Sequence, residues 1–382
     1  MADIPPVRTY GVKYIGSKNK ILQHILNTVE SCVDGDGDSD SEKTLIDVFT
    51  GTTRVGQAFR ANGWKVIASD LAWASENYAE LFLRTTRDEV AELRRLAIQL
   101  DRIGTREAQV AAACDGWITR TYCDVDPASG DGSPVRVWKP DNGSRADVIR
   151  DTIQEWVASG TISEDIGKKL VALLIMALDV VDSTVGVQQA YLKQWAARAS
   201  NTLCLEDRPP GDDREVWDGP VGELLGGDAL AIAYPSASVA YVDPPYTTHS
   251  YATYYHIWDS ISKWDKPEVG LKTNRRIDRV ARGGCHDKTM ASEWNVKKKV
   301  VDAFCKLVER LPVRRVVISY SNEALVSVDE VCKAVQELSC VDSCDVYAVD
   351  HSRNIMANIG NGADPGNHRN VVEYLLVFHK SE

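Results

Sequence analysis

A short apolar run that stops at two prolines constrains this chain more than any other stretch. Residues 239–242 (Val-Ala-Tyr-Val) predict a buried strand, and Asp243-Pro244-Pro245-Tyr246 follows directly. Proline fixes its own φ and has no N–H, so this loop presents carbonyls without competing donors. A carboxylate, outward carbonyls and a flat ring suit an aromatic amine, which would donate to Asp243 and stack on Tyr246. The alternative is an ordinary proline-rich turn after a core strand.

Length and composition place the chain among large globular proteins. Its 382 residues, 44% of them hydrophobic and 26% charged, suit one α/β domain with an insertion, or two domains. The N-terminus lacks the basic start and apolar run of a signal peptide. The longest apolar segment, residues 170–181, is too short for a membrane span and is interrupted by Asp179. Nine scattered cysteines without a Cys-x-x-Cys pair favour a reduced cytoplasmic protein with no disulfide framework and no metal site.

Charge is spread unevenly along the chain. The net charge of −11 argues against a nucleic-acid partner, but residues 34–42 alone hold five acids. Residues 266–299 hold ten basic residues against four acids, a local excess of six positive charges. Such a segment is a candidate for binding phosphates, and a solvated helix face is an equally good interpretation. We select five of its residues as candidate nucleic-acid contacts: Lys272, Arg275, Arg276, Arg279 and Arg282.

Two turns near the N-terminus have the pattern of ligand-binding loops. Residues 13–18 (Lys-Tyr-Ile-Gly-Ser-Lys) precede an apolar helical pattern, so they form either an anion-binding turn or a simple serine cap. Residues 44–56 predict a strand, a turn rich in Gly and Thr, and a helix. A second predicted strand then ends at Asp70, where an acid suits a ribose diol. This spacing indicates an adenosine-containing cofactor, and the scarcity of glycine argues against NAD.

Strands and helices alternate along most of the remaining chain. The pattern predicts a mainly parallel sheet with helices on both faces and an antiparallel edge formed by the last two strands. We expect residues 1–83 and 216–382 to form one discontinuous catalytic domain. Residues 84–215 read as a mostly helical insertion, in which Trp117, Trp138 and Trp156 serve as core anchors. The aromatic residues crowded into 251–258 fit either base stacking or a helix packed on the sheet, and we expect some of each.

Three signatures, in this order, resemble those of the alpha-class adenine-N6 DNA methyltransferases, the group that includes DNA adenine methylase. Residues 13–18 match the cofactor segment of that family, residues 47–51 its Asp-x-Phe-x-Gly loop, and residues 243–246 its catalytic Asp-Pro-Pro-Tyr. The resemblance extends over residues 10–83 and 180–380, including segments 186–198, 254–258, 319–321 and 373–376. The sequence departs from the family at Thr53, where a second glycine is usual. It also carries its basic stretch after the catalytic motif, whereas the family commonly places target recognition before it.

The resemblance implies a Rossmann-like methyltransferase fold and S-adenosylmethionine as cofactor. It implies that Asp243, Pro244, Pro245 and Tyr246 hold the target adenine. The implied cofactor-binding residues are Tyr14, Ile15, Gly16, Ser17, Lys18, Asp47, Phe49, Thr50, Gly51, Asp70, Asp228 and Ala229.

The expected activity is therefore site-specific methylation of the N6 amine of an adenine flipped out of double-stranded DNA. The alternatives are the same chemistry on RNA adenine, cytosine N4 or a protein glutamine and, more distantly, a non-catalytic nucleic-acid-binding protein. A cognate restriction endonuclease is a further candidate partner. We expect a cytoplasmic, nucleoid-associated protein of bacterial, archaeal or phage origin.

Overall fold

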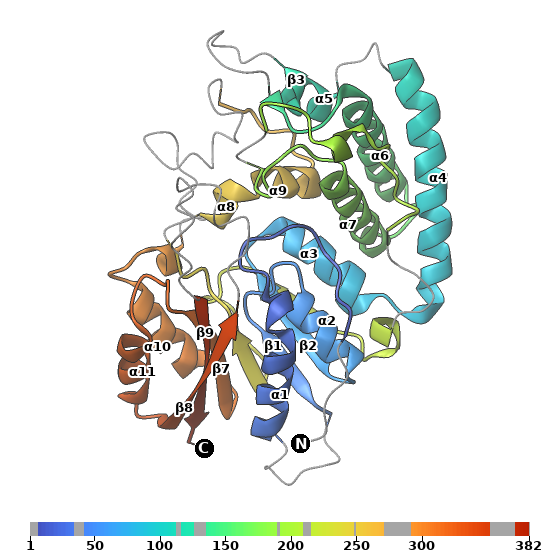
Figure 1. Ribbon diagram of the computed structural model, residues 1–382. Coiled ribbons are helices and arrows are strands. Elements are labelled where there is room, and N and C mark those ends of the chain that lie inside the picture. The colour runs from blue at the N-terminus through green and yellow to red at the C-terminus, as the bar shows by residue number, and fades with distance from the viewer. Residues whose placement is uncertain are drawn as a thin grey trace.

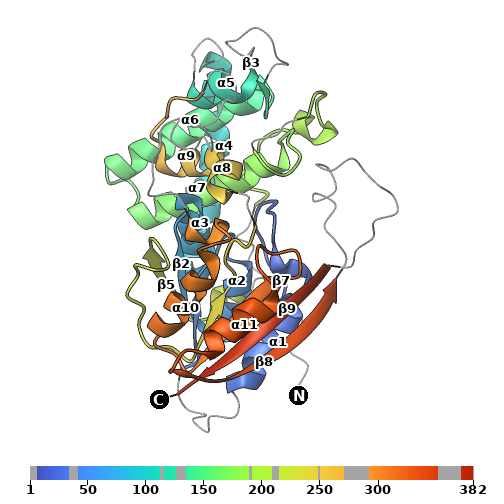
Figure 2. The ribbon, with the colours of Figure 1, turned by 90° about the vertical axis from the view of Figure 1, so that its left-hand side faces the viewer.

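A seven-stranded sheet carries the candidate site. The computed structural model describes residues 7–33, 42–111, 116–125, 135–188, 192–208, 215–247, 250–270, 292–351 and 371–381. The strands of the sheet are β1 (Thr44–Asp47), β2 (Lys65–Asp70), β5 (Glu223–Gly226), β6 (Val239–Val242), β7 (Arg315–Ser321), β8 (Val341–His351) and β9 (Val371–Lys380). Their order is β5-β2-β1-β6-β7-β9-β8. The first five run parallel, whereas β9 is antiparallel to both β7 and β8 (Figures 1 and 2).

The expected mainly parallel sheet with an antiparallel edge is confirmed. The residue pattern predicts strands at 315–321, 346–349 and 371–378, so β7 has the predicted bounds, whereas β8 and β9 are longer. The outermost strand is β8, because the chain returns through β9 and inserts it beside β7.

Helices cover both faces of the sheet, because successive strand residues point to opposite sides. Leu45 packs into one core with helices α1 (Leu22–Val33) and α2 (Arg54–Ala61). Ile46, the next residue, packs into the other core with α10 (Val300–Arg310) and α11 (Val328–Gln336). Each face is thus closed by its own pair of helices, as in other doubly wound folds.

A third apolar core belongs to a helical layer above the sheet in the view of Figure 1. It is built from α4 (Arg87–Ala111), α5 (Trp117–Tyr122), α6 (Pro140–Ala158), α7 (Glu164–Val180) and α9 (His256–Lys263), beside the short pair β3 (Cys123–Val125) and β4 (Val135–Arg136). Trp138 is fully buried there, Trp117 is nearly so, and Trp156 packs at its margin. Because α9 lies beyond residues 84–215, the layer also uses a segment outside the expected insertion, and those domain limits stay a prediction.

Shorter elements connect these layers. They are η1 (Lys18–Lys20), α3 (Trp73–Ala79), the π-helical turn η2 (Glu80–Arg84), η3 (Ala197–Ser200), η4 (Glu215–Asp218), α8 (Tyr251–Tyr254) and η7 (Glu293–Asn295). Helix α3 contacts β2 as well as α7 and α9, so it joins the sheet to the helical layer. Among the described helices, none is long and apolar enough to span a membrane.

Candidate active site

One cavity opens at the carboxyl ends of β1, β2 and β6, where strand order reverses around β1. This is the place where ligands bind in open α/β sheets. All four expected catalytic residues, 243–246, line it, as do nine of the expected cofactor residues: Tyr14, Ile15, Gly16, Lys18, Phe49, Gly51, Asp70, Asp228 and Ala229. The other three expected cofactor residues, Ser17, Asp47 and Thr50, do not line the cavity.

Asp47, the last residue of β1, holds the loop that follows this strand. This carboxylate is buried and accepts a hydrogen bond from the Thr50 hydroxyl at 2.8 Å. Burial raises the pKa of Asp47 to about 7, and the Thr50 hydrogen bond opposes that rise. Asp47 and Thr50 therefore shape the loop, while Phe49 and Gly51 face the cavity.

Thr53 takes the backbone conformation that glycine would favour. Its φ is 62°, in the left-handed region, and that of Gly51 is 51°. A β-branched residue adopts this conformation only when its surroundings enforce it. Here Thr53 is fully buried and its hydroxyl accepts a hydrogen bond from Gln57 Nε2 at 3.0 Å. The departure from the family pattern thus leaves the turn in a glycine-like geometry.

Asp70 joins the two loops that flank the cavity. Its Oδ2 accepts the Gly51 N–H at 2.8 Å, and its Oδ1 accepts the Ala72 N–H at 2.9 Å. Burial raises the pKa of this carboxyl, and the backbone N–H donors counteract the shift. The Ser75 hydroxyl and the Leu71 N–H also donate to this carboxyl, so Asp70 anchors the start of the segment after β2 as well as the loop after β1.

Tyrosines from two distant segments form one wall of the cavity. The Tyr14 ring stacks on Tyr255 with centroids 4.4 Å apart and lies 5.4 Å from the Tyr251 ring. The Ile15 N–H donates to the Tyr255 hydroxyl at 2.7 Å, and the Tyr251 hydroxyl donates to the Ile15 carbonyl at 3.2 Å. The sequence pattern pointed to this segment through its aromatic density, but we did not assign Tyr251 or Tyr255 to the site.

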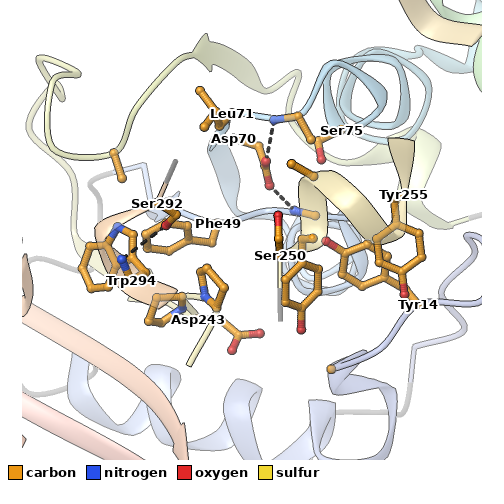
Figure 3. Close-up of a pocket in the computed structure, with 18 of the residues that line it drawn as sticks. Tyr14, Phe49, Asp70, Leu71, Ser75, Asp243, Ser250, Tyr255, Ser292 and Trp294 are labelled. Atoms are coloured by element: carbon orange, nitrogen blue, oxygen red, sulfur yellow. Dashed lines mark hydrogen bonds between the residues drawn. The ribbon is translucent and has the colours of Figure 1, made fainter. Parts of the chain in front are cut away.

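The opposite wall is formed by Phe49 and Trp294, whose rings meet edge to face at 5.1 Å (Figure 3). Figure 3 shows Asp70 and Asp243 between the two aromatic walls. Trp294 was missed by sequence reasoning, because a single tryptophan after a basic stretch carries no spacing signal. Phe304 lies behind it, 5.0 Å from its ring, and keeps its orientation.

The loop 243–246 is tied by an ion pair to Lys18, which we expected only to bind cofactor. Lys18 Nζ lies 2.8 Å from Asp243 Oδ1 and 3.2 Å from Glu373 Oε1. It also lies 5.1 Å from the centroid of the Tyr246 ring. Burial raises the pKa of Asp243 to about 6, a shift that Lys18 opposes and Glu373 reinforces. Burial disfavours the Lys18 ammonium, but the two carboxylates together raise its pKa well above the usual value.

The five candidate nucleic-acid contacts, Lys272, Arg275, Arg276, Arg279 and Arg282, lie outside the described residues and stay a prediction. The first described residue after that stretch, Ser292, lines the cavity. In the part of the chain that the structure describes, no three His, Cys, Asp or Glu side chains form a group able to hold a metal ion.

The chain is similar in sequence to known methyltransferases. The model of a family described as D12 class N6 adenine-specific DNA methyltransferase matches residues 14–311, well over half of the chain. The Type II methyltransferase M.NlaIII of Neisseria lactamica is 28% identical over 327 residues, which are 84% of this chain and 86% of that protein. M.CviAII of Paramecium bursaria Chlorella virus 1 is 26% identical over 343 residues, 90% of this chain and 92% of that protein.

M.FokI of Planomicrobium okeanokoites is 25% identical over 346 residues, but these cover 90% of this chain and only 49% of that longer protein. The family expected from the three signatures is confirmed. The chain belongs to the D12 class of N6 adenine-specific DNA methyltransferases.

Proposed function

We propose that this protein transfers a methyl group from S-adenosylmethionine to the N6 amine of an adenine flipped out of double-stranded DNA. The observation that carries the proposal is the position of Asp243. Its carboxylate, at the end of β6, lines the same cavity as Asp70 and Asp228, which end β2 and follow β5. One cavity therefore holds both a hydrogen-bond acceptor for an amine and a binding site for an adenosine derivative.

The residues around Asp70 fit the proposed cofactor. Two carboxylates, Asp70 and Asp228, offer acceptors for ribose hydroxyls and for an adenine amino group, and Phe49 offers an apolar face. At Gly51 a Cβ would already touch the Tyr14 ring, at 3.5 Å, so this turn and that ring lie against each other at the cavity. When bound, S-adenosylmethionine supplies an electrophilic methyl group on a sulfonium.

The catalytic loop supplies alignment and electrostatics. The exocyclic amine of adenine is conjugated with its ring and is a poor nucleophile. Asp243 and the Pro244 carbonyl accept hydrogen bonds from its two N–H groups and draw the nitrogen lone pair out of conjugation. Tyr246 stacks on the base, which must leave the duplex because its amine is otherwise paired.

The same cavity chemistry would serve adenine in RNA, cytosine N4 or a protein glutamine. The decisive test is transfer of tritiated methyl from S-adenosylmethionine to unmethylated DNA, RNA and protein in parallel. We expect label in DNA as N6-methyladenine at one recurrent sequence, and label confined to RNA or protein would refute the proposal. M.NlaIII, M.FokI and M.CviAII are named Type II methyltransferases, which supports a cognate restriction endonuclease as partner. We further propose that the protein acts in the cytoplasm, where its DNA substrate would lie.

A further inference from the structure

We propose that Glu373 is a positioning residue for methyl transfer: it shares the Lys18 ammonium with Asp243 and receives it when the target amine takes its place at Asp243. The inference rests on the proposed function. It concerns a residue of β9, beyond residues 14–311 that the family model matches.

Glu373 is held in place by a buried hydrogen bond and a buried ion pair. Only 2% of its surface is exposed, and its Oε1 accepts a hydrogen bond from the Ser319 hydroxyl of β7 at 2.7 Å. The same oxygen lies 3.2 Å from Lys18 Nζ, and the Lys18 side chain is 6% exposed. A buried carboxylate with a fixed donor on one side and an ammonium on the other is a costly arrangement, kept only where its partners compensate it.

Lys18 lies where the substrate must come. Its ammonium is 2.8 Å from Asp243 Oδ1 and 5.1 Å from the centroid of Tyr246, the ring on which the base would stack. An incoming amine therefore competes with the ammonium for the same carboxylate. If Asp243 were its only anionic partner, the buried Lys18 ammonium would be left unpaired when the amine displaced it, which is strongly unfavourable. Glu373 gives it a second anion within reach of a small movement.

Glu373 also makes Asp243 a better acceptor. Its negative charge adds to burial in raising the pKa of Asp243, whereas Lys18 lowers it. The other charged or titratable groups around Asp243 are Asp47 on β1, Tyr241 on β6, Tyr246 in the catalytic loop and Tyr251 on α8. Burial raises the pKa of each tyrosine, so all three stay neutral over the working range. Removal of the charge on Glu373 should therefore lower the pKa of Asp243.

The test is Glu373→Gln, which keeps the shape and the acceptor for Ser319 but removes the charge. Initial rates of tritiated methyl transfer to unmethylated DNA are measured from pH 5 to 9, with S-adenosylmethionine binding by calorimetry. We expect kcat to fall about tenfold at neutral pH because Lys18 then pairs with Asp243 alone. The acid limb of kcat/KM should move down by roughly one pH unit, while cofactor affinity is unchanged. Glu337→Gln, on an exposed glutamate just after α11, is the matched control and should behave as wild type.

Lys18→Met provides an independent variant with the opposite sign. Without the ammonium, two buried carboxylates face each other, so the acid limb should move to higher pH. This variant keeps the inference testable if Glu373→Gln does not fold, and an unmoved acid limb in Lys18→Met would overturn it. If folded Glu373→Gln lost rate but kept the acid limb of kcat/KM in place, the role of Glu373 would be purely structural. If the variant behaved as wild type, Glu373 would have no role in methyl transfer. Either result overturns the inference, but the proposed function still stands as long as the wild-type protein methylates DNA. A wild-type protein without methyl transfer refutes the function itself.

Discussion

The Tyr255 hydroxyl accepts the backbone N–H of Ile15 at 2.7 Å, across 240 residues of chain. The stacked Tyr14 and Tyr255 rings lie beside this bond. Two segments that are far apart in sequence thereby become one wall of the cavity, and the N-terminal segment is held by the chain that follows Asp243-Pro244-Pro245-Tyr246.

Replacing Tyr255 with Phe should loosen that wall. The change removes the acceptor for Ile15 but keeps the ring stack, so we expect a loss of about 1–2 kcal/mol in unfolding free energy. Affinity for S-adenosylmethionine should fall with it. Denaturant unfolding and calorimetric titration measure both effects. Tyr347→Phe, on a ring that is 47% exposed on β8, is the control, and equal behaviour of the two variants would contradict the assigned role.

Asp70→Asn should weaken cofactor binding more than it affects folding. The carboxylate accepts two backbone N–H groups, and an amide offers only one oxygen for them. We expect the Kd for S-adenosylmethionine to rise roughly 10- to 100-fold, with a smaller loss in kcat at saturating cofactor. Asp302→Asn, on the exposed side of α10, should leave the Kd unchanged. A wild-type Kd in Asp70→Asn would remove Asp70 from the cofactor site.

Arg60 should matter for stability alone. Its buried guanidinium donates to the carbonyls of Phe82, Thr85 and Pro220 at 2.8–2.9 Å. Arg60→Met leaves these carbonyls unpaired, and we expect a loss of about 3 kcal/mol in unfolding free energy. Methyl transfer well below the melting temperature should be retained. Arg95→Met, on a side chain that is 64% exposed, should change stability little, and a comparable loss there would contradict the argument.

Activity should depend on pH through Asp243. Burial raises its pKa to about 6, and only the carboxylate form accepts the amine hydrogen. Below that pH, kcat/KM should fall about tenfold per unit. The contribution of Asp243 to folding stability depends on pH in the opposite direction to activity. A raised pKa in the folded state favours folding at acid pH, and this contribution is lost as pH rises through about 6. Unfolding curves measured beside the rates will separate the two, and a flat profile from pH 5 to 8 would contradict the assignment.

Local patterns were sufficient to predict the strands that carry the site, although β8 and β9 extend beyond their predicted ends. The predicted strand 315–321 is β7, Asp70 ends β2 and Asp243 follows β6, as expected because period and turn chemistry are local. The link between Lys18, Asp243 and Glu373 was beyond reach, since it depends on β9 lying between β7 and β8. The left-handed backbone conformation of Thr53 could not be predicted either, because threonine normally avoids it.

The most direct test of the account is Asp243→Ala, assayed for methyl transfer to DNA and for S-adenosylmethionine binding in the same preparation. Because Asp243 is assigned to the target amine, methyl transfer should drop at least about 10²- to 10³-fold. Cofactor affinity should stay within about threefold of wild type, since the cofactor contacts are assigned to Asp70, Asp228 and Phe49. Full methyl transfer by the variant would contradict the central claim.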